Sequence, residues 1–480
     1  MKVFIFLLTA CTVSAQTTLI TGARIADGTG LALRSGSVRI EGDRIVAAGA
    51  LKTNAGEMVI HADGLVLAPG FIDPHNHSTD ALEKDPGAAS QISQGITTML
   101  VGQDGGSPWP IGEYLKKRSQ QPATVNLQVM VGHATVRRKV MGDDFRRHAR
   151  PDEIAAMQKL VEQAMQEGAV GLSSGLEYEV GSYSTTEEVI ALAKVAAKYK
   201  GIYVSHLRDE SDLAFDSFRE IIRIGEEAHL PVQISHIKLG TAGVWGKAAE
   251  AVKLIAAARA RGVDITADCY PYDAWGSTIT VLVPDKQYDN PASVAKALAD
   301  VGGAANVLVT SSKAHPDYEF KTLEQIGTPV DTFIRIVKDG GASVVVKAMT
   351  DTDIRTFYQQ PWVMVGSDGG IGMRHPRGAG SFPRVLGVYV RERQWLTLPQ
   401  AIRKMTSAPA ARLNLKDRGV IRAGAKADLV LFDPGKVMDR STFAEPLKLS
   451  EGIEKVWVNG ELVWTDAHAT EARPGKVLPR

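Results

Sequence analysis

Two histidines separated by one residue, His75 and His77, end the apolar stretch "LVLAPGFIDPHNH". In a β-strand, side chains two positions apart project from the same face. Both imidazoles could therefore reach one metal ion, because ring nitrogens are common zinc ligands. A polar loop after a strand could have the same sequence, so these two residues alone do not distinguish a metal site from such a loop.

Further side chains that could bind a metal occur where later apolar segments end. His206 ends "GIYVSH", His236 ends "PVQISH", Glu177 follows "AVGLSSGL" and Asp368 follows "WVMVGS". A single histidine at a strand end is commonly a hydrogen-bonded loop residue, and a single aspartate before glycine commonly forms a turn. Four histidines and two carboxylates at the ends of different segments are instead typical of a binuclear metal hydrolase.

The segments that carry these residues indicate the fold. Eight short β-like runs alternate with amphipathic helices, of which the clearest begins with a capping box of Ser184 and Glu187 and ends at Gly201. Eight such units predict an α/β protein with a (β/α)8 TIM-type barrel. The active site of such a barrel lies at the carboxyl ends of its strands, which would bring the histidines and carboxylates together.

The domain organisation follows from the similar sequence patterns at the two ends of the chain. Short β-like runs broken by glycine and aspartate turns predict one small β-sandwich built from residues 16–66 and 416–480. The barrel is expected to occupy residues 67–283 and 348–415. The segment between these parts, residues 284–347, is too long for a simple connection and is expected to be an inserted subdomain or lid.

The first fifteen residues, 1–15, are predicted to be a signal peptide. Lys2 precedes the apolar run "VFIFLLTACTV", and "VSA" before Gln16 offers small residues for cleavage, so export to the periplasm or secretion is expected. Two alternatives remain: the first strand of a cytosolic protein, and a lipid-attachment box "LTAC" at Cys11. The run is too short to span a bilayer, and no later segment resembles a membrane helix. Without the leader, Cys269 is the only cysteine, which excludes an internal disulfide or CxxC site.

The composition favours a small-molecule partner. The chain has 480 residues, 44% hydrophobic content and a formal net charge of +1, without long runs of like charge. Nothing in this balance favours nucleic acid or an anionic membrane surface. The oligomeric state stays open.

Several blocks of the sequence resemble one known family. They include "PGFIDPHNH", "GLSSGLEYEVG", "YVSHLRDE", "VQISHIKLG", "VGSDGG" and "HPRGAGSFPRVLG". These blocks are similar to the amidohydrolase superfamily, and within it to the N-acyl-D-amino-acid deacylases (D-aminoacylases), over nearly the whole mature chain. The resemblance implies a hydrolase with two zinc ions per chain that removes the acyl group from N-acyl-D-amino acids. Its substrate would be a small N-acyl amino acid or dipeptide.

The expected zinc ligands follow from the strand ends and the resemblance. His75, His77 and Asp368 would hold one ion, and His206 and His236 would hold the other. Hydroxide formed from zinc-bound water would attack the amide, since zinc lowers the pKa of its water toward ~7. Asp368 would accept the water proton and return it to the departing amine.

One position departs from the family pattern. After the second strand the family usually carries a cysteine ligand in a "GNCG"-like turn, whereas this chain reads "GQDGG" with Asp104 there. Glu177 occupies a position that is typically apolar in those deacylases. We expect Glu177 to bridge the two metals in place of the thiolate. Asp104 is the alternative ligand, or it forms a simple Asx turn.

Four residues match positions that contact the substrate in the resembling enzymes. Arg377 matches the arginine that binds the α-carboxylate, for which a guanidinium fork is geometrically suited. Tyr178, Lys238 and Ser277 match the other contact positions. Tyr178 could instead be an aromatic residue of the barrel rim, and Lys238 a solvated lysine.

Other functions of the same fold stay open at this point. A metallo-dipeptidase or a cyclic amidase, similar to a dihydroorotase or hydantoinase, would use the same metal ligands. A non-catalytic scaffold would be expected to have lost ligands, yet the histidines and Asp368 are all present. The acyl group and the side-chain preference are not readable from the sequence, and the D configuration rests on the resemblance alone.

Overall fold

A computed structural model describes residues 17–480. The predicted signal peptide at residues 1–15 and the candidate lipidation site at Cys11 lie outside the described residues. Within the described part, no helix has both the length and the apolar character needed to cross a membrane.

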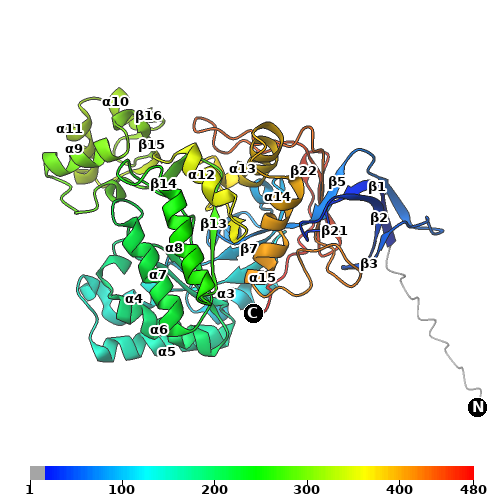
Figure 1. Cartoon of the computed structure of the whole chain (residues 1–480), viewed down its shortest axis with the longest axis horizontal. Coiled ribbons are helices and arrows are strands. Elements are labelled where there is room, and N and C mark those ends of the chain that lie inside the picture. Colours follow the sequence, from blue (N-terminus) through cyan, green and yellow to red (C-terminus); the bar gives the residue numbers. More distant parts are fainter. Residues whose placement is uncertain (1–16) are drawn as a thin grey trace, which may run out of the picture.

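Both ends of the chain build one nine-stranded sheet, which lies at one end of the molecule in Figure 1. Its two halves join where β5 runs antiparallel to β19, with Val66 opposite Phe432. Ile20, Val38 and Trp457 are buried in a core that belongs to this sheet. The strands from the N-terminal part are β1 (Thr17–Ile25), β2 (Arg34–Glu41), β3 (Arg44–Gly49), β4 (Met58–His61) and β5 (Val66–Pro69). Those from the C-terminal part are β19 (Leu429–Phe432), β20 (Ile453–Val458), β21 (Glu461–Thr465) and β22 (His468–Ala469).

The centre of the chain forms the predicted (β/α)8 barrel. Its wall consists of two parallel sheets, β6-β7-β8 and β9-β10-β11-β12-β13-β18, which follow one another at β8 and β9. On the other side a parallel bridge between Asn76 and Gly369 joins the ends of β6 and β18. The strands are β6 (Phe71–Asp73), β7 (Ile96–Val101), β8 (Asn126–Val129), β9 (Val131–Gly132), β10 (Gly171–Gly175), β11 (Ile202–His206), β12 (Val232–Ile234), β13 (Ile265–Cys269) and β18 (Val363–Val365).

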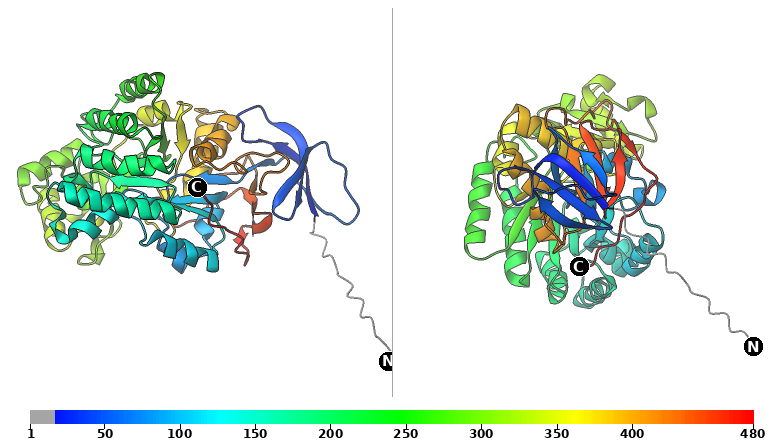
Figure 2. Two further views of the ribbon diagram at one scale, coloured as in Figure 1. Left: turned by 90° about the horizontal axis from the view of Figure 1, so that it is seen from below. Right: turned by 90° about the vertical axis from the view of Figure 1, so that its right-hand side faces the viewer.

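The barrel helices cover the outside of this wall, as both views of Figure 2 show. Helix α6 begins one residue later than predicted, because Thr185 Oγ1 accepts the backbone N–H of Glu188 while the Ser184 hydroxyl donates to Gly181. The helices are α1 (Ala81–Lys84), α2 (Ala89–Ile92), α3 (Ile111–Gln120), α4 (His133–Met141), α5 (Pro151–Glu167), α6 (Thr186–Lys198), α7 (Ala214–Ala228), α8 (Ala248–Ala260), α12 (Asp351–Tyr358), α13 (Arg377–Arg384), α14 (Leu398–Met405) and α15 (Ser407–Arg412).

The stretch predicted as one first barrel strand is divided between two sheets. Val66–Pro69 pairs within the terminal sheet, and Phe71–Asp73 belongs to the barrel. Gly70 lies between them, where an added Cβ would come 2.3 Å from Thr97 Oγ1. Only glycine therefore lets the chain pass this close to β7, and the passage fixes the start of the strand that carries the two histidines.

The inserted segment is a separate small unit at the opposite end of the molecule from the terminal sheet (Figure 1). Its antiparallel sheet starts at Ala274, before the expected boundary at residue 284, because β14 pairs along its whole length with β17. Val294, Val307 and Phe333 are buried in a core of its own. The elements are β14 (Ala274–Thr278), β15 (Val307–Ser311), β16 (Lys321–Thr322), β17 (Ser343–Lys347), α9 (Pro291–Asp300), α10 (Leu323–Ile326) and α11 (Pro329–Lys338).

Candidate metal centre

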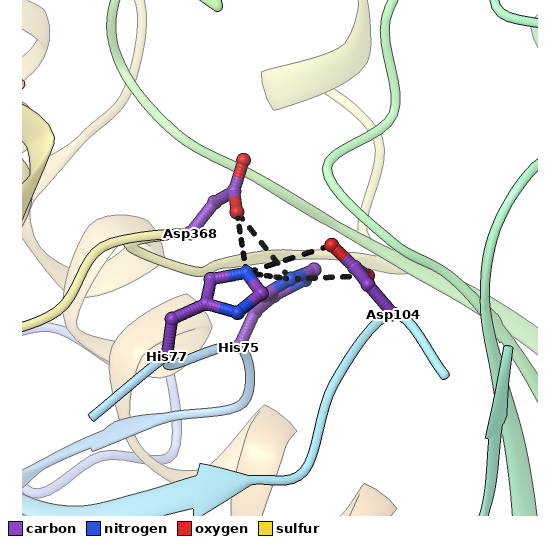
Figure 3. Close-up of side chains that lie close together, drawn as sticks. All are labelled: His75, His77, Asp104 and Asp368. Atoms are coloured by element: carbon purple, nitrogen blue, oxygen red, sulfur yellow. Dashed lines mark hydrogen bonds and ion pairs between the residues drawn. The ribbon is translucent and has the colours of Figure 1, made fainter. Parts of the chain in front are cut away.

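Four candidate ligands meet where β6, β7 and β18 end. His77 Nε2 lies 3.0 Å from Asp368 Oδ1, and His75 Nε2 lies 3.4 Å from the same oxygen. Asp104, from the turn after β7, faces both imidazoles, and one ligand atom from each of the four residues lies within 4.8 Å of the others (Figure 3). Backbone hydrogen bonds hold this arrangement. The Asp368 N–H donates to the His75 carbonyl oxygen, and the His77 N–H donates to the Gly369 carbonyl oxygen.

Asp104 also belongs to a second group of donors, with His206 from β11 and His236 after β12. Its Oδ2 lies 3.5 Å from His77 Nε2 and 3.7 Å from His236 Nε2. His206 Nδ1 lies 2.9 Å from His236 Nε2. The carboxylate common to the two groups is therefore that of Asp104.

The chemistry of this donor set fits zinc. Imidazole nitrogens and carboxylate oxygens are ligands that zinc accepts. Asp104 Oδ1 is buried and has no hydrogen-bond partner among residues 17–480. A buried carboxylate oxygen without a hydrogen bond is costly, and its ion-pair partner His75 Nε2 is 3.5 Å away, so Oδ1 indicates a position that a cation would satisfy.

Glu177, the predicted bridging ligand, contacts His206 but is not in the group that contains His75 and His77. Its Oε2 lies 2.7 Å from His206 Nε2, the ring nitrogen that is not turned toward His236. It joins a third group with His206 and Glu210, and His75 and His77 are not among its partners there.

The four predicted substrate-binding residues line one cavity of about 280 Å³ beside these donors. Arg377 Nη1 lies 2.7 Å from Asp368 Oδ2, and the Tyr178 hydroxyl lies 3.1 Å from His206 Nδ1. Lys238 Nζ donates to Glu210 at 2.5 Å. Ser277 comes from β14 of the inserted unit, so this unit completes the wall of the cavity.

The charges of the site favour ionised carboxylates. Burial opposes ionisation of Asp104, but His75 and His236 hold its pKa well below the usual range. Burial likewise opposes ionisation of Asp368, and Arg377 together with His236 holds its pKa well below the usual range. Both side chains therefore carry negative charge at neutral pH.

Two neighbouring residues of the site were not singled out from the sequence. Asp268, at the end of β13, accepts the backbone N–H of His236 and lies 3.2 Å from His75 Nδ1. Tyr270 follows it, with its ring 5.0 Å from the guanidinium carbon of Arg377. Both follow the same strand-end rule as the histidines, so that rule could have identified them.

Known proteins resemble this chain along most of its length. The amidohydrolase family profile matches residues 58–464. An N-acyl-D-aspartate deacylase of Alcaligenes xylosoxydans xylosoxydans is 36% identical over 488 residues, which are 96% of this chain and 94% of that protein. A D-aminoacylase of the same organism is 36% identical over 491 residues, which are 96% of this chain and 97% of that protein.

Solved structures agree with the sequence comparison. A crystal structure of D-aminoacylase superposes with a TM-score of 0.88 at 34% identity, covering 96% of this chain and 99% of that chain. N-acyl-D-glutamate deacylase from Bordetella bronchiseptica, in complex with zinc and a phosphonate inhibitor, superposes with a TM-score of 0.88 at 33% identity, covering 97% and 100% of the two chains.

Proposed function

The chain belongs to the amidohydrolase family, in the branch of the N-acyl-D-amino-acid deacylases, and we propose that it is a zinc-dependent hydrolase that removes the acyl group from N-acyl-D-amino acids. The observation that carries this function is the pair of donor groups that share Asp104 beside a cavity lined by Arg377. Metal ligands and a group that binds a carboxylate are what such a hydrolase needs in one place.

The proposed metal ligands form two sets. His75, His77 and Asp368 would hold one zinc ion, and His206 and His236 would hold the other; Asp104 belongs to both groups of donors. When bound, zinc supplies Lewis acidity, which polarises a carbonyl group and lowers the pKa of water toward ~7.

Asp368 carries the proton during the reaction. It lines the cavity, and although burial opposes its ionisation, the Arg377 guanidinium holds its pKa well below the usual range. Its carboxylate can accept the proton of the attacking water and pass it to the nitrogen of the departing amine.

Two cavity residues orient the substrate. The Arg377 guanidinium binds the α-carboxylate, since its planar fork matches two carboxylate oxygens. Burial and the charge of Asp104 raise the pKa of Tyr178 well above its usual value, so its phenol keeps its proton. That O–H can donate to the carbonyl oxygen as negative charge develops there.

A substrate panel tests this function. Zinc-loaded protein should release acetate from N-acetyl-D-amino acids much faster than from the L enantiomers, and exhaustive chelation should abolish the release until zinc is added back. Dipeptides and hydantoins belong in the same panel. Faster hydrolysis of those compounds, or activity that survives chelation, would replace the proposed function by a dipeptidase, a cyclic amidase or a metal-independent enzyme.

Export is proposed on the sequence alone. Lys2, the apolar run after it and the small residues before Gln16 support a cleaved leader. Expression of the full chain in a bacterium with a periplasm should yield a mature protein that begins near Gln16, as intact mass would measure. A protein that keeps its first residues in the cytosol would contradict export.

A further inference from the structure

The imidazole of His206 has a different kind of neighbour at each ring nitrogen. Nδ1 lies 2.9 Å from His236 Nε2, on the side of the proposed metal ligands. Nε2 lies 2.7 Å from Glu177 Oε2. The residue is 4% exposed, so these neighbours replace water around most of the ring.

These contacts define which nitrogen carries the proton. A neutral imidazole has one N–H donor and one acceptor nitrogen, and an ionised carboxylate only accepts. With Glu177 against Nε2, the proton belongs on Nε2 and the lone pair on Nδ1.

The position of Glu177 argues against its being a ligand itself. Its carboxylate contacts Nε2 of His206, whereas Nδ1 is the nitrogen that lies against His236. A separate cation between Glu177 and Glu210 would meet the Lys238 ammonium, which lies 2.5 Å from Glu210 Oε2. The Lys238 ammonium therefore already supplies the positive charge beside Glu210 that a metal ion would otherwise supply.

We propose that Glu177 is a positioning residue, which holds His206 in the tautomer and orientation that present Nδ1 to the metal shared with Asp104 and His236. The role rests on the proposed zinc function. Carboxylates that accept the second N–H of a ligating histidine fix its ring and raise its basicity, and their loss commonly weakens metal affinity 10- to 100-fold. Glu177 then acts through His206 without touching the metal.

The test compares zinc binding by Glu177→Gln and Glu177→Ala in the full-length protein. The number of zinc ions bound at saturation and their dissociation constants are measured by competition with a chromophoric chelator. Both variants should bind as many ions as the wild type, with the affinity of one site weakened about 10- to 100-fold in Glu177→Ala. The zinc affinity of Glu177→Gln should lie between those of the wild type and Glu177→Ala, because the glutamine amide oxygen can still accept a hydrogen bond from His206 Nε2–H.

Glu179→Gln is the matched control, because this nearby carboxylate is 56% exposed and pairs with Arg146 outside the metal ligands. It should bind zinc like the wild type. The visible spectrum of cobalt(II)-substituted protein gives a second readout, since a changed orientation of His206 alters the ligand field whereas loss of a merely structural contact does not.

Three results would overturn the proposal. Loss of one bound ion in Glu177→Gln would make Glu177 a ligand, and wild-type affinity in Glu177→Ala would leave it without a role. An unaltered cobalt spectrum in a well-folded Glu177→Ala would also show that Glu177 does not position His206. If Glu177→Ala does not fold, the zinc affinity and the cobalt spectrum of Glu177→Gln provide the test. Zinc binding does not depend on the substrate, so failure of the wild type to hydrolyse N-acyl-D-amino acids would overturn the proposed function and leave this test intact.

Discussion

At the scale of single residues, Asp104 is the member that the two proposed groups of zinc ligands share. Its backbone has a φ of 54°, in the left-handed region that asparagine and aspartate tolerate better than most residues. One short side chain in this turn faces His75, His77 and His236 together. We expect Asp104→Asn, which preserves the turn, to bind fewer than two zinc ions per chain.

Metal analysis after dialysis against buffered zinc measures this effect. Asp104→Cys should keep two ions, because a thiolate is also a strong zinc ligand. An Asp104→Asn protein that still binds two ions with wild-type affinity would show that this carboxylate is not shared between the metals.

Asp368 is expected to be indispensable for turnover. Asp368→Asn removes the proton acceptor, and losses of general acid–base catalysis are commonly about 10²- to 10⁴-fold in kcat. The circular dichroism spectrum should stay that of the wild type, since the amide can keep the contact with His77. Steady-state kinetics on N-acetyl-D-leucine with zinc-saturated protein measure the loss, and a variant that keeps full activity would remove Asp368 from the proton path.

At the scale of elements, a buried ion cluster ties α4 to α6. Glu188 accepts from His133 Nε2 at 2.9 Å and pairs with Arg137, and both partners are fully buried. Removing one member of a buried pair leaves an uncompensated charge, so Glu188→Ala should lower the unfolding free energy by about 3–5 kcal/mol. Chemical denaturation measures this difference, and Glu187→Ala is the exposed control on the same helix, with an expected change below about 1 kcal/mol.

The same cluster has a defined pH dependence. Burial raises the pKa of Glu188, but His133 and Arg137 outweigh it and bring the pKa below its ordinary 4.5. A carboxyl group with a lowered folded-state pKa stabilises the fold above pH 4.5 and loses that contribution as the pH falls through the folded value. The stability gap between wild type and Glu188→Ala should therefore be full at pH 7 and shrink below pH 4.5. A gap that widens on acidification would contradict this role.

The sequence predicted those site residues that lie at regular strand ends. His75, His77, His206, His236 and Asp368 follow apolar runs, and the carboxyl ends of parallel strands share one end of a barrel, so their meeting could be predicted. The sequence left Asp104 and Glu177 as alternative ligands, because the side chains that face His206 come from other strands of the barrel and their orientation is not readable from spacing. Strand β14 was not predicted either, since it exists only through its pairing with the distant β17.

At the scale of the whole molecule, we expect the cavity between the barrel and the inserted unit to set the preference for the substrate's side chain. Among the described residues, its lysine and arginine side chains are Lys238, Lys296 and Arg377. Lys238 is paired with Glu210 and Lys296 with Asp300, while Arg377 is needed for the α-carboxylate. Besides the carboxylates near the proposed metal ligands, four more line the cavity: Asp209, Asp212, Asp285 and Asp300.

Within this cavity, a second carboxylate on the substrate would therefore meet only cations that are already paired or already bind the α-carboxylate. We expect kcat/KM for N-acetyl-D-asparagine to exceed that for N-acetyl-D-aspartate by at least about 10-fold, which corresponds to about 1.4 kcal/mol. The two substrates have nearly the same shape, so the comparison isolates the charge. Equal or higher efficiency with the aspartate derivative would mean that one of the two lysines leaves its partner to bind the substrate.

The shared terminal sheet has a consequence for the nascent protein. A ribosome makes β5 early and its neighbour β19 only after the last barrel strand, so one edge of β5 stays open during most of synthesis. Open strand edges pair with other polypeptides, and such long-range pairing forms slowly. A message truncated before Leu429 would therefore encode every proposed metal ligand and every barrel strand, yet its product should collect in inclusion bodies.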